Sequence, residues 1–194
     1  MSPRPIEQPI YESILKRYTE FRICPNTSLS SKVRCQSAWP LNSGRRSVAA
    51  GYAILWGGLV AGVLDSVDGV IAFGTQGLNP IQVLQYIASG ALGKSAFRGG
   101  MATAALGAVF HFLIAWVAAA VFVVASRRIP ALKTRAAAFG LLYGVAVYFF
   151  MNYLVLPLSA VAPSPFHIGL FLNGVIGHAL FVGLPIALYS RRIR

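Results

Sequence analysis

The chain has 194 residues, of which 56% are hydrophobic and only 11% are charged. Soluble globular domains carry about 25% charged residues, so this composition excludes an ordinary soluble protein and favours one whose surface faces lipid. The formal net charge is +12, from 17 basic and 5 acidic residues. Because the basic residues flank long apolar segments, they indicate membrane topology, and we expect no nucleic-acid partner.

Residues 1–46 differ in composition from the rest of the chain. They mix Pro, Ser, Arg and isolated apolar residues without a sustained helical or strand period. We expect a disordered cytoplasmic tail in which Cys24 and Cys35 are reduced thiols and no zinc module forms. The change in composition leaves open a translation start near residues 44–47, which N-terminal analysis of native protein would test.

The remaining sequence predicts an all-α, polytopic membrane protein with four transmembrane helices. A helix that crosses the bilayer needs about 20 mostly apolar residues. Four segments reach that length: 47–73, 101–125, 135–159 and 166–189. Short connections make the second, third and fourth helices antiparallel neighbours, so the expected architecture is a four-helix bundle.

Basic residues are unevenly distributed between the two ends of this predicted bundle. Eight precede the first span, four lie between the second and third, and three follow the fourth, whereas only Lys94 and Arg98 lie between the first and second. Positively charged segments stay in the cytoplasm. We therefore expect a multi-pass membrane protein with both termini cytoplasmic.

A shorter helix is predicted between the first and second spans. Asn79 is suited to cap a helix that begins at Pro80. The segment 80–92 would be about 20 Å long, which is too short to cross a bilayer. We expect an interfacial or partly re-entrant helix on the outer side. Its apolar and polar residues separate on an ideal helix: Ile81, Leu84, Ala88 and Ala91 share one face, with Gln82, Gln85 and Ser89 elsewhere.

Each predicted span carries polar side chains at membrane depth, where a polar group needs a partner, a wet cavity or a function. These residues form the candidate site: Asp65, Asp68, His111, Asn152, Asn173 and His178. Asp65 and His111 each lie in the middle of a line of small residues at helical spacing. Small residues let helices approach closely in lipid. We therefore expect Asp65 and His111 to face each other, and the same faces could support a homo-oligomer. The lines are Gly58, Gly62 and Gly69 in the first span, and Gly100, Ala104, Gly107, Ala115 and Ala118 in the second.

The other two spans give less regular patterns. In the fourth, His178 lies about 140° from Asn173 around an ideal helix, so we expect the two to point at different neighbours unless Pro185 twists the helix. In the third, Gly140 and Gly144 form a packing motif, and Asn152 lies on another face.

Several interpretations of the polar residues stay open. Asp65, Asp68, His111 and His178 offer oxygen and imidazole ligands suited to Zn, Mn or Fe. His111 and His178 could together hold a haem, and Asp65 with His111 could form a proton or ion path. The simplest interpretation is a hydrogen-bonded Asp–His pair that fixes helix register, with Asn152 and Asn173 as interhelical hydrogen bonds. On this interpretation the protein needs no cofactor, and we expect none.

Several short segments within residues 57–187 support a resemblance to a known family. They are segment 58–62 leading to Asp65, segment 87–93, His111 with Phe112, and Asn152 with segment 157–159. In these pieces, and in the run 173–187, the chain resembles small bacterial four-span inner-membrane proteins of unassigned function. A weaker resemblance, to YagU-like inner-membrane proteins, rests on a His near the last span and the closing Arg pair. Both imply a bacterial inner membrane, and neither supplies a catalytic residue.

Motifs typical of enzymes are missing from the sequence, which contains no G-x-S-x-G, no phosphate-binding glycine loop and no H-E-x-x-H. We therefore expect a non-catalytic membrane protein that packs, scaffolds or assists assembly, with its polar residues holding the bundle. The alternative is a small transporter, or a protein that handles protons or metal ions through Asp65 and His111.

Overall fold

A computed structural model describes residues 41–162 and 165–192. The described part is helical, and it contains four helices long and apolar enough to cross a membrane: Ser47–Gly74, Gly100–Arg128, Ala136–Leu158 and Ile168–Arg191. These bounds confirm the predicted all-α polytopic fold, with each span within a few residues of its predicted position. The predictions for residues 1–40, including the two cysteines, lie outside the described residues.

The first span belongs to a helix, α2 (Leu41–Gly74), that starts earlier than the span itself. The sequence pattern places residues 41–46 in the tail, whereas they are helical. Hydropathy identifies only the apolar part of a helix. It therefore does not detect the first one and a half turns of α2, which are polar and include Arg45 and Arg46. No proline follows Leu41 to stop the helix there.

The other spans are one continuous helix and two helices that are each interrupted by a π-helical turn. The second span is α4 (Gly100–Arg128). The third consists of α6 (Ala136–Phe150), the π turn η2 (Met151–Val155) and α7 (Leu156–Leu158). The fourth consists of α8 (Ile168–Gly177), the π turn η3 (His178–Gly183) and α9 (Leu184–Arg191).

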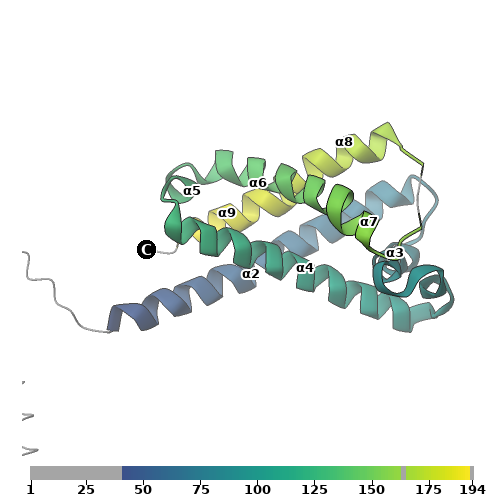
Figure 1. The fold of residues 1–194 in the computed structure, drawn as a ribbon, viewed down its shortest axis with the longest axis horizontal. Coiled ribbons are helices and arrows are strands. Elements are labelled where there is room, and N and C mark those ends of the chain that lie inside the picture. Colours follow the sequence, from purple (N-terminus) through teal and green to yellow (C-terminus); the bar gives the residue numbers. More distant parts are fainter. Residues whose placement is uncertain (1–40, 163–164, 193–194) are drawn as a thin grey trace, which may run out of the picture. The chain divides into compact units, whose positions relative to one another are not determined.

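Shorter helices occupy the connections and define the two ends of the bundle. The predicted interfacial helix is α3 (Pro80–Leu92), followed by the 3₁₀ helix η1 (Gly93–Arg98), and α5 (Ala131–Thr134) joins the second span to the third. In Figure 1, α3 and η1 lie at one end, called here the α3 end. The helix α5 and the last turn of α9 lie at the other, called the α5 end.

The predicted cap of α3 is confirmed, and it is complete on both sides. The side chain of Asn79 accepts a hydrogen bond from the Gln82 backbone N–H at 3.0 Å, and the Asn79 backbone N–H donates to Gln82 Oε1 at 2.9 Å. This capping box satisfies two backbone donors that a helix start would otherwise leave unpaired.

The face that α3 packs against the other helices includes polar residues, and its predicted apolar face is only partly buried. The buried residues are Val83, Gln85, Ala88 and Ser89, while Ile81 is 41% exposed. The reason is that α3 packs on the start of α4, where Gly107 lets the Leu84 carbonyl approach its Cα directly. This surface offers backbone carbonyls, and the buried Gln85 side chain donates to the Gly100 carbonyl at 2.9 Å. A polar face is therefore buried because it finds partners there.

Small residues let the spans approach closely, as the sequence predicts. A Cβ at Gly62 in α2 would lie 2.8 Å from the Phe112 ring of α4, and one at Gly140 would lie 2.7 Å from Ala187 Cβ. The face of α4 that contains Gly107 contacts two helices. The first half of this face packs against α3, and the second half packs against α2. These small-residue faces are therefore used within the chain.

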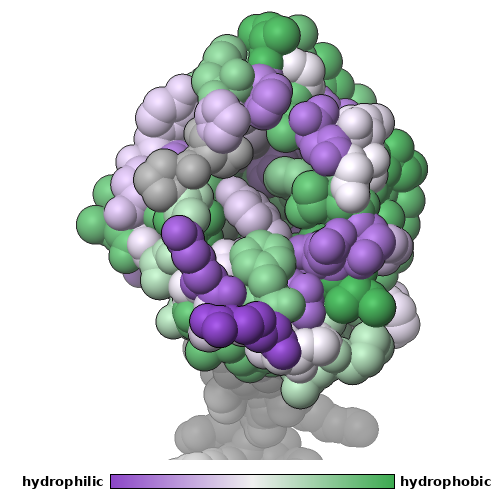
Figure 2. Space-filling view, turned by 90° about the vertical axis from the view of Figure 1, so that its right-hand side faces the viewer, coloured by the Kyte–Doolittle hydropathy of each residue, from purple (hydrophilic) through white to green (hydrophobic). Residues whose placement is uncertain are grey.

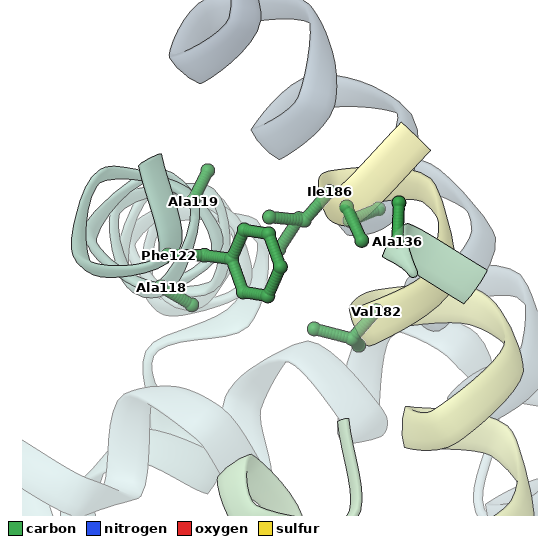
Figure 3. Close-up of a cluster of buried hydrophobic side chains, with 8 residues drawn as sticks. Ala118, Ala119, Phe122, Ala136, Val182 and Ile186 are labelled. Atoms are coloured by element: carbon green, nitrogen blue, oxygen red, sulfur yellow. The ribbon is translucent and has the colours of Figure 1, made fainter. Parts of the chain in front are cut away.

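An apolar core fills the half of the bundle nearer the α5 end. Figure 3 shows Phe122 of α4 pointing toward Ile186 and Val182 of the fourth span, with Ala136 beside them. Phe122 is 2% exposed and Ile186 is fully buried. The ring of Tyr143 packs edge-on against Phe122 at 5.0 Å, and its hydroxyl donates to the Ala118 carbonyl at 2.8 Å. Apolar side chains fill most of this half of the interior, and its buried hydroxyls, Ser126 and Ser190, bond to each other at 2.9 Å.

Candidate intramembrane polar site

Five of the six predicted polar residues converge in the half of the bundle nearer the α3 end. They form what we call the polar cluster: Asp65 and Asp68 of α2, His111 of α4, Asn173 of α8 and His178 of η3. The cluster joins three spans. It has two levels, since Asp65, His111 and His178 lie about 14 to 16 Å from the α3 ends of their spans, and Asp68 and Asn173 about 8 to 9 Å, at 1.5 Å per residue.

The carboxylate of Asp65 lies between two imidazole rings. His111 Nε2 is 3.9 Å from its Oδ2, and His178 Nδ1 is 3.7 Å from its Oδ1. Both distances are too long for hydrogen bonds, but within range of an ion pair when the imidazole is protonated. The three side chains are 14 to 22% exposed. The predicted approach of Asp65 and His111 is confirmed, and His178 joins them.

The ring of His111 is oriented by a backbone group. Its Nε2 lies 2.9 Å from the Gly62 carbonyl oxygen of α2. A carbonyl can only accept a hydrogen bond, so this nitrogen carries a hydrogen and donates it. The contact also ties α4 to α2 at the point where Gly62 lets them approach. His111 is thus positioned by packing and by its own hydrogen bond.

His178 has a different environment from His111. Its Nδ1 is buried and has no hydrogen-bond partner among the described residues. The ring of Tyr148 packs edge-on against it, with the centroids 5.4 Å apart. A buried polar atom without a partner is rare in folded proteins and calls for an explanation, such as a water, an ion or a functional role. The nearest group that could share a proton with it is the Asp65 carboxylate, 3.7 Å away.

Asp68 and Asn173 make the direct interhelical hydrogen bond of the cluster. Asn173 Nδ2 donates to Asp68 Oδ2 at 2.9 Å. The two helices meet at Gly177, where a Cβ would lie 2.5 Å from the same oxygen. The interhelical role predicted for Asn173 is confirmed by this bond.

Asn173 and His178 reach two different carboxylates of one helix, α2, so His178 does not face a different helix from Asn173. The two positions lie on opposite sides of Gly177, and the close approach of α2 at that glycine brings its two carboxylates within reach of both. The angle between two residues on an isolated helix gives no information on the distance to a neighbouring helix. That distance determines which side chains reach the neighbour.

Asn152 lies outside the polar cluster, contrary to its predicted interhelical role. Its Nδ2 donates to the Tyr148 carbonyl of its own helix at 3.0 Å. It stands in η2, where the Leu156 N–H bonds to the Met151 carbonyl five residues earlier. Pro157 has no N–H to give to the preceding turn, so the helix widens before it. Asn152 thus supplies a donor to a widened turn.

The arrangement gives little support to a metal or haem. Within the part of the chain that the structure describes, no three His, Cys, Asp or Glu side chains are placed to hold one metal ion. A haem bound through His111 and His178 would have to lie between their rings. The Asp65 carboxylate occupies that place.

The sequence alone does not identify Tyr148 as part of the site, or the π turn that begins at His178. Tyr148 is 8% exposed and packs on both His178 and Gly174, where a Cβ would overlap its ring. The signal for the π turn is Pro185, since the Leu184 N–H bonds to the Ala179 carbonyl five residues earlier. Single π turns inside helices occur frequently at functional sites.

Comparisons with protein-family models, with curated proteins and with solved structures find no match to this chain. The fold and the cluster therefore define its class by themselves. It is a small multi-pass membrane protein whose spans enclose two carboxylates and two imidazoles.

Proposed function

We propose that this protein is a non-enzymatic protein of the bacterial inner membrane that binds and releases protons at the polar cluster. The observation that carries the proposal is the position of Asp65 between two imidazoles, neither of which makes a direct hydrogen bond to it. At 3.9 and 3.7 Å, either imidazole can form an ion pair with the carboxylate when it carries a proton, without a fixed hydrogen bond between them. The bacterial location rests on the resemblance to small four-span inner-membrane proteins.

The chemistry of the cluster suits proton exchange. Imidazole is the side chain that gains and loses a proton most readily near neutral pH, and the Nδ1 atom of His178 is unpartnered among the described residues. Ionisable residues within spans commonly mark proton relays.

The interior is polar toward the α3 end and mainly apolar toward the α5 end, which favours proton access from the α3 end. Asp68 and Asn173 lie nearer that end than Asp65 and continue the polar route toward it. Figure 2 looks onto this end and shows hydrophilic residues gathered across it. The core around Phe122 and Ile186 closes the other half with apolar side chains. This arrangement supports proton entry from the α3 end, and release at the α5 end then requires the apolar core to open.

The charges at the two ends support an orientation in which the α3 end is outside. Only Lys94 and Arg98 lie at the α3 end, whereas the α5 end carries most of the basic residues of the described chain: Arg127, Arg128, Lys133, Arg135, Arg191 and Arg192. Positively charged segments stay in the cytoplasm. Both termini are then cytoplasmic, and the cluster takes its protons from the periplasmic side.

Proton movement into liposomes tests the proposal. The purified full chain is reconstituted with a pH-sensitive dye inside, and a potassium diffusion potential is imposed. We expect acidification that exceeds empty liposomes and is lost in Asp65→Asn, which removes the titratable carboxylate but keeps the shape. Asn152→Ala is the matched control, since Asn152 is polar and intramembrane but lies outside the cluster. Equal rates for wild type and Asp65→Asn would contradict the proposal.

A packing or scaffold role is the second candidate, and specific contacts favour it. The bonds from His111 to the Gly62 carbonyl and from Asn173 to Asp68 join three spans. If the cluster only holds the bundle, Asp65→Asn lowers thermal stability in detergent and wild type moves no protons. Under the proton proposal, Asp65→Asn remains folded and inactive.

A further inference from the structure

A groove of about 520 Å³ lies between the first and fourth spans, in the half of the bundle nearer the α5 end. We propose that it binds an anionic phospholipid, with one acyl chain along the groove and the phosphate at Arg192. Aliphatic side chains line most of it and a Tyr–Arg pair closes it: Val60, Leu64, Leu180, Leu184, Leu188, and Tyr189 with Arg192. The inference is independent of the polar cluster, because none of its five residues lines the groove.

The length of the groove fits one leaflet of a bilayer. From Leu180 to Arg192 the fourth span rises by about 18 Å at 1.5 Å per residue. One leaflet of hydrocarbon is about 15 Å thick. A chain that starts at Arg192 therefore reaches the bilayer midplane near Leu180. The apolar side chains extend over that whole depth and the charge stands only at its end.

Arg192 is held where a lipid phosphate would lie. Its guanidinium sits over the Tyr189 ring, 5.3 Å from the centroid, and both residues belong to the wall of the groove. Arginine and tyrosine are typical of the membrane–water interface, and a guanidinium can hold a phosphate through two parallel hydrogen bonds. The only carboxylates in the described part of the chain, Asp65 and Asp68, belong to the polar cluster. The charge at this end thus complements an anionic headgroup.

Native mass spectrometry of the purified full chain can test the proposal. The protein is titrated in detergent with phosphatidylglycerol and, separately, with phosphatidylcholine of the same chains. One basic residue near an anionic lipid corresponds to about a fivefold preference. We expect wild type to prefer phosphatidylglycerol by about that factor, and Arg192→Gln to reduce the preference to about one.

Two further variants separate the groove from general attraction to a basic surface. Arg127→Gln removes an exposed charge at the same end but outside the groove, and we expect it to keep the preference. Leu188→Trp places a larger side chain in the groove at a position 43% exposed, so it should weaken both lipids equally without unfolding the protein. Equal losses in Arg127→Gln and Arg192→Gln, or unchanged binding in Leu188→Trp, would overturn the proposal.

Discussion

Backbone contact between the third and fourth spans depends on the absence of a side chain at single positions. A Cβ at Gly144 would lie 2.7 Å from Ala179 Cα and would overlap the His178 carbonyl, and one at Gly183 would overlap the Gly140 carbonyl. The neighbouring atoms are backbone, so they cannot move aside without moving a helix. The same contact holds His178 next to Asp65, which links these glycines to the polar cluster.

Gly144→Ala should therefore destabilise the protein. Inserting one carbon into a close-packed contact costs about 1 to 3 kcal/mol, and here the contact is backbone on both sides. The expected result is a lower midpoint of thermal unfolding in detergent. Gly69→Ala is the control, because Gly69 has nothing within 4 Å of its Cβ position and alanine favours a helix. A stability of Gly144→Ala equal to that of Gly69→Ala would contradict the packing described here.

The two intramembrane asparagines make a second comparison at the scale of residues. Both occur in apolar spans, and the sequence does not tell them apart. Asn173 bonds to Asp68 of another span, whereas Asn152 bonds to its own helix. The interhelical role predicted for both holds only for Asn173, because the role depends on which helix lies opposite, and a single sequence gives only the helix each residue belongs to.

Asn173→Ala should cost more stability than Asn152→Ala. Interhelical hydrogen bonds in membranes contribute about 0.6 kcal/mol on average and up to about 1.7 kcal/mol. The Asp68 bond belongs at the upper end because its loss leaves a carboxylate without its amide partner. Unfolding of both variants in mixed micelles measures the difference. Equal losses would mean that Asn173 does not hold the fourth span to the first.

Among the elements, α3 has a start that the sequence specifies and a buried face that the sequence does not specify. Its start is encoded locally, since Asn79, Pro80 and Gln82 are cap residues at the required spacing. The face that it buries is set by α4. Gln85 and Ser89 are buried because the Gly100 carbonyl and the turn of α3 itself accept their hydrogen bonds. Periodicity identifies the apolar face of α3, but the face that packs on α4 depends on the hydrogen-bond partners available there.

Asn79→Ala should loosen α3 without disturbing the spans. Loss of an N-cap side chain costs about 1 kcal/mol. The cost falls on an element outside the four spans, so it should appear as local opening. Hydrogen exchange read by mass spectrometry should show faster exchange over residues 80–92 and unchanged exchange over α4. Exchange that rises equally in α4 would show that α3 and the second span open as one unit.

The π turns show how prolines in a span are accommodated. Each turn ends two residues before a proline, at Val155 before Pro157 in the third span and at Gly183 before Pro185 in the fourth. Proline removes one backbone donor, and a widened turn redistributes the bonds that remain. The prolines are visible in the sequence, but the choice between a kink and a π turn is made by packing. Gly140 and Gly144 provide that packing where η3 lies against α6.

At the scale of the whole molecule, apolar length and charge lead to the four-span fold, and neither needs information about contacts. The small-residue faces, by contrast, can be interpreted only when the neighbouring helix is known. Those of Gly62 and Gly140 are covered within the chain, so a homo-oligomer remains a prediction. It would have to use other small positions, such as Gly51 or Gly169, which have nothing within 4 Å of their Cβ positions.

Orientation is the property of the whole molecule on which the direction of proton access depends. In a variant with Cys24 and Cys35 replaced by Ser, a single cysteine is placed at Gln76, on the exposed turn before α3, or at Thr134, in α5. A membrane-impermeant maleimide should label Gln76→Cys in intact spheroplasts and Thr134→Cys only after permeabilisation. The excess of basic residues at the α5 end is the physical reason, since positive segments are retained in the cytoplasm.

The opposite labelling pattern would place the α3 end in the cytoplasm. The polar cluster would then exchange protons with the cytoplasm, and the phospholipid proposed at Arg192 would belong to the outer leaflet. A control follows from the charges themselves. Arg127→Gln with Arg128→Gln removes two of the basic residues that retain the α5 end, so a fraction of the chains should insert inverted. A mixed pattern in that variant, with a single pattern in the parent, ties the orientation to charge.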